Sequence, residues 1–169
     1  MLPLNMSNVD TDQIMPKQFL KRVERSGYGE FLFYDWKKDP EFPLNNKAYK
    51  GSRVLVAGDN FGTGSSREHA PWGLQDWGFD AIISTKFADI FRLNSINIGL
   101  VPIETDQKTV DTLFAKIESN PSTNIIISIE NKTVKCEEIE LSFDVDDYSQ
   151  KRILEGLDKI YITLGYTDT

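Results

Sequence analysis

Short apolar runs alternate with helical patterns along the middle of the chain. The runs Val54–Ala57, Ala81–Ile83 and Leu100–Ile103 are typical of strands that are buried on both faces. The clearest helix is predicted over Thr105–Ser119, where apolar residues recur at helical spacing until Asn120-Pro121 ends the pattern. Because helices and buried strands alternate, the sequence predicts an α/β fold built of packed layers.

The remaining elements are less regular. We expect an extended entry over 1–14 that ends in a turn at Asn8–Asp12, and a loop over Lys37–Lys50. No internal repeat or linker interrupts the chain, so a single domain over 1–169 is expected. Further helices are predicted over Pro16–Glu24, Phe87–Asn94 and 147–157, and further strands over Ile125–Ile129, Thr133–Cys136 and Ile139–Phe143, the first two of them joined by a hairpin through Asn131-Lys132.

Composition excludes several classes of function. The chain has 19 Lys and Arg against 26 Asp and Glu, a net charge of −7, which opposes binding to a nucleic-acid backbone. No run approaches the roughly 18 apolar residues of a membrane span, and the first residues lack signal-peptide character, so we expect a cytoplasmic protein. The single cysteine, Cys136, cannot hold an iron–sulfur cluster, and the single histidine, His69, cannot build a usual zinc site. We therefore expect no metal site in this chain and a buried, apolar role for Cys136.

The most informative segment is Gly58–Ala70, with the sequence GDNFGTGSSREHA. It matches neither the phosphate-binding P-loop nor the dinucleotide fingerprint, because the required lysine and third glycine are missing. Ser65 followed by Glu68 has the spacing of a helix capping box, and a helix start of this kind favours bound anions. Arg67 adds a guanidinium that matches a carboxylate. If the helix started at Ser66, Pro71 would fall in its second turn and leave a carbonyl without its partner. An anion site and an ordinary capped helix both remain open.

These residues also carry a family resemblance. GDNFGTGSSREHAPWGL, NVDTDQIMPKQFLKR and FADIFRLNSINIGLVPIE closely resemble the small subunits of 3-isopropylmalate dehydratase, as do GYGEFLFYDW and RILEGLDKIYITL. That family is similar to the carboxyl-terminal domain of aconitase, which implies a layered, swivelling β/β/α domain. The resemblance implies a hydro-lyase of leucine biosynthesis that isomerises 2-isopropylmalate, a small dicarboxylate, to 3-isopropylmalate by dehydration and rehydration. It also implies a large-subunit partner that binds the 4Fe–4S cluster.

The resemblance implies roles for several residues. Ser66 corresponds to the catalytic base, and Arg67 to the cation that stabilises it and the substrate. Asp12 matches an acidic residue near the family's active site, although it could also be a turn aspartate. A second cation for substrate is expected from Lys17, Lys21 or Arg22, with Lys21 preferred over a solvated helix cation. Gly64 and Ser65 are expected to bind substrate, and His69 is expected to be structural.

An aromatic segment with two glycines lies in 27–37, where the family has a mobile substrate loop. We expect Gly27 and Gly29 to act as hinges, and Phe31, Leu32 and Phe33 to contact the isopropyl group; the alternative is that these side chains are ordinary core. Residues 28–36 include no Lys or Arg, which favours an apolar substituent over the carboxylate of related substrates. The alternative functions are a homoaconitate or citraconate hydratase subunit, and a non-catalytic anion-binding module.

Overall fold

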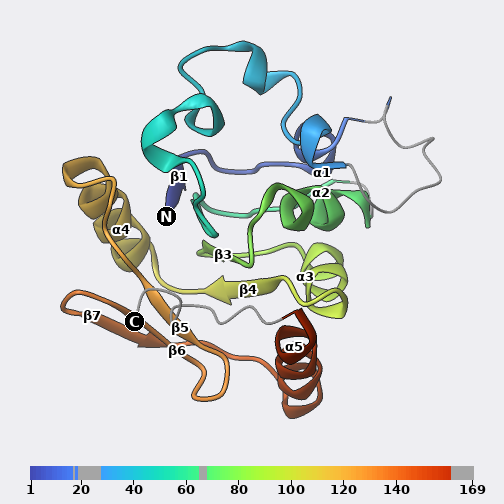
Figure 1. Cartoon of the computed structure of the whole chain (residues 1–169), viewed down its shortest axis with the longest axis vertical. Helices are drawn as coiled ribbons and strands as arrows, with labels where there is room; N and C mark the ends of the chain where they lie inside the picture. The colour runs from blue at the N-terminus through green and yellow to red at the C-terminus, as the bar shows by residue number, and fades with distance from the viewer. Residues whose placement is uncertain (17, 19–27, 65–67, 161–169) are drawn as a thin grey trace.

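A four-stranded parallel sheet forms the centre of the molecule (Figure 1). The computed structural model describes residues 1–16, 18, 28–64 and 68–160. The strands are β1 (Leu2–Leu4), β2 (Val54–Ala57), β3 (Ala81–Ser84) and β4 (Val101–Glu104), and they lie side by side in the order of the sequence. The three buried strands predicted from sequence are thereby confirmed, and β1 joins them along β2. Because all four strands are parallel, their carboxyl ends meet at one edge of the sheet.

Helices and a small second sheet cover the two faces of this parallel sheet. The second sheet is antiparallel, with strand order β5-β6-β7, and Lys132 takes a left-handed conformation in the predicted hairpin. The α-helices are α1 (Thr11–Ile14), α2 (His69–Trp77), α3 (Asp89–Asn97), α4 (Gln107–Ser119) and α5 (Asp147–Ile160); the 3₁₀ helices are η2 (Tyr28–Phe31), η3 (Trp36–Lys38), η4 (Pro43–Asn45) and η5 (Lys47–Tyr49); and the small sheet consists of β5 (Ile126–Ser128), β6 (Thr133–Cys136) and β7 (Ile139–Ser142).

Two hydrophobic cores lie on opposite faces of the parallel sheet. Successive side chains of a strand point to opposite faces, so Leu55 and Ala57 join the core beneath α2 and α3, whereas Val54 and Val56 join the core beneath α4 and the small sheet. All four are buried, and a fully buried side chain of valine or leucine size contributes roughly 1.5–3 kcal/mol. The molecule is therefore layered as helices, parallel sheet and small sheet, which agrees with the predicted α/β class.

The helix predicted over Thr105–Ser119 is α4, and it begins where its cap allows. The side chain of Asp106 accepts a hydrogen bond from the backbone N–H of Thr109 at 2.7 Å, so the helix starts at Gln107. Its apolar stripe is buried through Val110, Leu113 and Ile117. The apolar periodicity thus explains why this segment is a helix, and the Asp106 cap explains where the helix begins.

Two predicted boundaries are wrong. The helix after the glycine-rich loop, α2, begins at His69, and Glu68 rather than Ser65 stands at its N-cap position. The later start places Pro71 in the first turn, where the missing N–H needs no partner. The turn expected at Asn8–Asp12 instead leads into the short helix α1.

The physical reason for α1 is a capping box that the sequence reading did not identify. Asp10 accepts from the N–H of Gln13 at 2.8 Å, and the Gln13 side chain accepts from the N–H of Asp10 at 3.0 Å. The helix predicted over Pro16–Glu24 lies almost wholly outside the described residues. Of the helices in the described part of the chain, none has the length and apolar character that a membrane crossing requires.

Candidate functional site at the carboxyl edge of the sheet

Three loops meet at the carboxyl edge of the parallel sheet. The loop after β1 contacts the loop after β2, where the N–H of Thr11 donates to the carbonyl of Thr63 at 2.8 Å. The loop after β2 contacts the loop after β3, where the N–H of Phe61 donates to the carbonyl of Lys86 at 2.8 Å. Ligands of open α/β sheets bind outside the carboxyl ends of the strands. This edge is therefore the candidate site.

Two asparagines hold the first pair of loops together. Asn8 and Asn60 both adopt the left-handed conformation, each with a φ of 58°, which asparagine tolerates better than most residues. The Asn60 side-chain amide donates to Oδ1 of Asn8 at 3.1 Å, and the N–H of Asn8 donates to the carbonyl of Asp59 at 2.8 Å. The pair links a turn after β1 to the start of the glycine-rich loop.

The glycines of this loop are required by close packing. Gly62 has a φ of +84°, and a Cβ there would lie 2.3 Å from Cγ of Phe91 in α3. Gly64 has a φ of +92°, and a Cβ there would lie 3.3 Å from Cβ of Asp10, the N-cap of α1. The loop is thus seated between α3 and α1 by contacts that a side chain would disturb.

The structure brings together two of the predicted site residues, Gly64 and Asp12. Asp12 is exposed and lies in the first turn of α1, two residues after the N-cap that faces Gly64. The predicted base Ser66, its neighbours Ser65 and Arg67, and the candidate cations Lys17, Lys21 and Arg22 lie outside the described residues. The described residues that flank this segment are Gly64, which lies against Asp10, and Glu68, which stands at the N-cap position of α2.

The predicted substrate side chains of the aromatic segment are largely in the core. Leu32 and Phe33 have no exposed surface, and Phe33 stacks on Trp36 with ring centroids 5.6 Å apart. Phe31 is half-buried beside this core. Leu32 and Phe33 have their partners within this chain: Cδ1 of Leu32 would lie 3.5 Å from a Cβ on Gly73 of α2, and the N–H of Phe33 donates to the carbonyl of Ile14 at 2.8 Å. Burial favours the core role for Leu32 and Phe33 and leaves Phe31 as the candidate contact.

Gly29 allows the segment to approach α2 closely. Its N–H donates to Oδ2 of Asp76 at 2.9 Å, and an added Cβ would lie 3.0 Å from the backbone nitrogen of Trp77. This contact explains Gly29 by close packing rather than by the hinge that was expected. Gly27, the other expected hinge, lies outside the described residues.

His69 packs among aromatic rings at the start of α2. Its ring centroid lies 5.3 Å from that of Tyr28 and 4.8 Å from that of Trp72. Edge-on and tilted ring contacts of this kind stabilise packing. The geometry supports the structural role that the sequence suggested for His69.

The described residues do not fit an iron–sulfur cluster. Cys136 lies in β6 with 1% of its surface exposed, and burial raises the pKa of its thiol, which disfavours the thiolate that binds metal. Across the described ranges, no group of three or more His, Cys, Asp or Glu side chains is placed to hold a metal ion. A cluster therefore has no set of ligands in this part of the chain.

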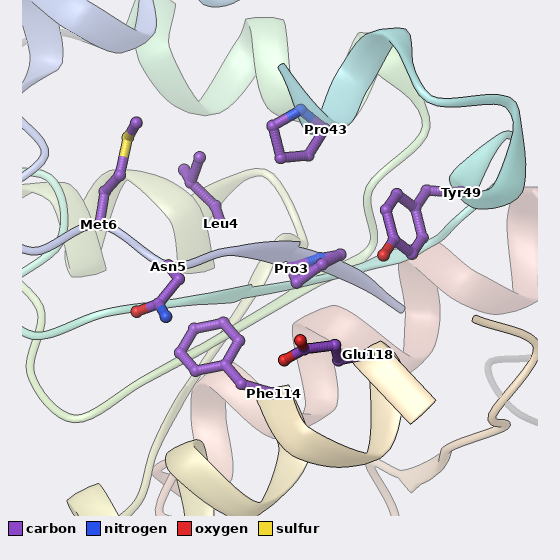
Figure 2. Close-up of a pocket in the computed structure, with 8 residues that line it drawn as sticks. All are labelled: Pro3, Leu4, Asn5, Met6, Pro43, Tyr49, Phe114 and Glu118. Carbon is purple, nitrogen blue, oxygen red and sulfur yellow. The ribbon is translucent and has the colours of Figure 1, made fainter. Parts of the chain in front are cut away.

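A separate pocket of about 360 Å³ lies along the free edge of β1 (Figure 2). Pro3 and Leu4 form its base, Tyr49 closes one side, and Phe114 and Glu118 of α4 close the other. None of the predicted site residues lines it. The pocket shares Asn5 and Met6 with the loop after β1, but it contains none of the residues that carry the predicted chemistry.

Sequence reasoning missed several residues that position the site. Asn8, Asn60 and Phe91 were not singled out, and neither was Ser84, whose buried hydroxyl donates to the carbonyl of Gly58 at 2.7 Å. Asn8 and Asn60 could have been found from the sequence, because an asparagine in a loop next to a strand favours a left-handed turn. The contact between Gly62 and Phe91 had no local signal, because it joins residues from different elements.

Comparison with known proteins agrees with this geometry. Residues 1–108 match the family model of the aconitase C-terminal domain. The 3-isopropylmalate dehydratase small subunit of a Nocardioides species is 52% identical over 171 residues, covering 99% of this chain and 85% of that protein. The corresponding subunit of Streptomyces coelicolor is 52% identical over 163 residues, covering 96% and 83%.

A solved structure of 3-isopropylmalate dehydratase from Methanocaldococcus jannaschii gives the same result. It superposes with a TM-score of 0.66 at 26% identity and covers 95% of this chain and 93% of that one. The chain belongs to the aconitase C-terminal domain family and, within it, to the family of 3-isopropylmalate dehydratase small subunits.

Proposed function

We propose that the carboxyl-edge loops form this chain's half of the active site of a 3-isopropylmalate dehydratase. Family membership makes the chain a small subunit of this hydro-lyase of leucine biosynthesis. The proposal adds which residues act, and that the enzyme works in the cytoplasm with a large subunit as partner. A small dicarboxylate would bind between the two subunits at this edge.

One observation carries the proposal: the junction between Thr11 and Thr63. Their backbone hydrogen bond of 2.8 Å places the start of α1 against the glycine-rich loop. Asp12 and Gly64 therefore lie at the same edge, although they are far apart in the sequence. Ser66 and Arg67 follow Gly64 closely in the sequence, so the predicted base is close in the chain to this junction.

The proposed chemistry assigns each of these groups a role. Ser66 would remove the proton from the carbon next to a substrate carboxylate, and the C–O bond of the hydroxyl on the neighbouring carbon would break, so that an alkene forms with the overall loss of one water. Re-addition of water would then place the hydroxyl on the neighbouring carbon. A serine is a weak base unless its alkoxide is stabilised, which Arg67 and the loop N–H groups of Gly64 and Ser65 would do.

Asp12 and Lys21 would act on the substrate from α1 and the segment after it. Lys21 would pair with the second carboxylate, opposite Arg67. We infer that the 4Fe–4S cluster belongs to the large subunit, because the single cysteine of this chain is buried in β6 and disfavoured as a thiolate.

The test is reconstitution with the large subunit. The chain is co-expressed with that subunit, iron and sulfide are restored without oxygen, and turnover of 2-isopropylmalate is measured beside homoaconitate and citraconate. Ser66→Ala should lower kcat by several orders of magnitude while the subunits still pair, and Ser65→Ala is the matched control with a much smaller loss. A loss below about tenfold for Ser66→Ala, roughly 1.4 kcal/mol in the barrier, would place the base elsewhere. Turnover by this chain alone would refute the need for a partner.

A further inference from the structure

The three most exposed large hydrophobic side chains of the described chain lie on two neighbouring helices. Ile90 and Leu93 of α3 are 50% and 60% exposed, and Tyr148 of α5 is 71% exposed. The two helices contact each other, and Arg92 donates to the carbonyl of Asp144, just before α5, at 3.3 Å. Figure 1 shows α3 and α5 one beside the other at the side of the molecule. We name the surface of Ile90, Leu93 and Tyr148 the α3–α5 patch.

Ile90 and Leu93 share one face of α3, and Tyr148 lies on the neighbouring helix. Ile90 and Leu93 are three residues apart, so they lie on one side of α3, while Phe91 and Ser95 on its other side are buried. Single exposed hydrophobic residues are normal, but a group of them indicates a contact surface. The inner side of α3 thus packs on the core and its outer side remains available.

The α3–α5 patch begins beside the candidate active site. Phe91, the residue after Ile90, fills the space over Gly62 in the glycine-rich loop. Ala88, just before α3, donates its N–H to the carbonyl of Phe61 at 3.0 Å. A partner that reached the loop to share a substrate would therefore meet the first turn of α3.

Charged residues of both signs surround the patch and indicate the chemistry of its partner. Four exposed carboxylates flank the two helices where the patch lies: Asp89, Asp144, Asp146 and Asp147. Cations lie among them: Arg92 on α3, Lys151 on α5, and Lys132, which pairs with Asp147 at 3.5 Å. An apolar centre with a charged rim is the usual anatomy of a protein interface. The complementary surface is apolar with charged side chains of both signs around it.

We propose that the α3–α5 patch is the surface on which the large subunit docks, through an apolar contact with a rim of mixed charge. This inference rests on the proposed function, in which the partner supplies the other half of the active site. It assigns the docking to the outer side of α3, whose inner side positions the catalytic loop.

The test compares two exposed positions that carry apolar side chains. Leu93→Glu should raise the Kd for the reconstituted large subunit at least tenfold, measured by sedimentation under anaerobic conditions. Ile126→Glu is the matched control, because Ile126 is 43% exposed on β5, a strand that carries no residue of the patch, and its Kd should stay within threefold of wild type. Ile90→Glu is the second variant, so that a folding fault in one variant does not decide the result. A Kd for both α3 variants within threefold of wild type would overturn the proposal.

The experiment distinguishes an error in the proposed docking surface from an error in the proposed function. At saturating large subunit, Leu93→Glu should keep the kcat of the wild type, because Leu93 does not touch substrate. If wild-type chain pairs and turns over isopropylmalate while both α3 variants bind normally, only the docking surface is wrong. If wild-type chain neither pairs nor reacts, the proposed function fails. Self-association that Leu93→Glu abolishes, with unchanged pairing to the large subunit, would assign the patch to a second copy and overturn the proposal.

Discussion

Phe91 of α3 occupies the space in which a side chain on Gly62 would stand. A Cβ on Gly62 would lie 2.3 Å from Cγ and 2.7 Å from Cβ of Phe91, and Gly62 also has a φ of +84°. The Phe91 ring is itself held by Phe61 and Phe87, whose centroids lie 5.3 Å and 6.2 Å away. The ring therefore cannot move aside easily, and the glycine-rich loop is fixed to α3 at this point.

Gly62→Ala should consequently destabilise the protein more than the backbone conformation alone explains. Gly51 is the matched control, since it has nearly the same φ of +83° but no atom within 4 Å of an added Cβ. We expect Gly51→Ala to cost about 1–2 kcal/mol from the left-handed conformation, and Gly62→Ala a further 1–3 kcal/mol or so from overpacking. Urea unfolding of both variants measures the difference. Equal losses would show that the loop adjusts to the extra carbon.

Arg67→Lys tests whether the guanidinium of Arg67 binds a substrate carboxylate through two parallel hydrogen bonds. A lysine keeps the positive charge but offers a single point charge in place of two parallel N–H donors. We expect a higher KM and a lower kcat/KM for 2-isopropylmalate in the reconstituted enzyme. The control is Arg67→Gln, which should lose more because it also removes the charge. Kinetics of Arg67→Lys that match the wild type would assign Arg67 a structural role.

Specificity in the aromatic segment should be tested at Phe31 rather than at Leu32. Leu32 has no exposed surface, so Leu32→Arg would bury a charge without a partner and should unfold the domain. Phe31 is half-buried at the rim of the same core, so Phe31→Arg can send its charge to the surface. If Phe31 contacts the isopropyl group, this variant should turn over 2-isopropylmalate less well and improve relative use of a substrate with a carboxylate there. An unchanged ratio between the two substrates would exclude the contact.

The fold was predictable wherever local patterns and packing agree. The runs Val54–Ala57 and Ala81–Ile83 predicted buried strands because side chains on both of their faces enter a core, which makes each run apolar throughout. The helix α4 was predictable because its stripe of Val110, Leu113 and Ile117 repeats at helical spacing. In these elements the burial that stabilises the fold also sets the sequence pattern.

The site was harder to predict because its geometry depends on contacts between distant segments. Nothing near Gly62 in the sequence announces that Phe91 will pack against it, or that Thr63 will accept a hydrogen bond from Thr11. The aromatic segment misled the sequence reading for a similar reason. Leu32 and Phe33 follow the 3₁₀ helix η2, so their positions have no helical or strand periodicity. The core that they enter forms only when η2 packs against α2, which lies far away in the sequence.

Arg53 and Asp80 form a partly buried ion pair at the amino ends of β2 and β3, and it predicts a pH-dependent effect on stability. Nε of Arg53 donates to Oδ2 of Asp80, and the two side chains are 32% and 14% exposed. Burial raises the pKa of the Asp80 carboxyl above its ordinary value, and the hydrogen bond and charge of Arg53 oppose that rise. Removing the cation by Arg53→Met should therefore raise the pKa of Asp80 further.

The sign of the pH dependence follows from proton binding. A carboxyl whose pKa is raised by folding binds more protons in the folded state than in the unfolded state, so stability falls as pH rises through that range. Arg53→Met widens this range, so its loss of stability relative to wild type should be largest at neutral pH, roughly 1–3 kcal/mol for a buried charge without its partner. The loss should shrink as the pH falls toward the ordinary pKa of aspartate, where Asp80 is protonated in both states. Urea unfolding across this pH range measures the trend, with Lys135→Met as the control, because its pairing with Glu140 is exposed and should change stability little at any pH. A loss that stays constant with pH would mean that Arg53 stabilises the fold by packing alone, without acting on the charge of Asp80.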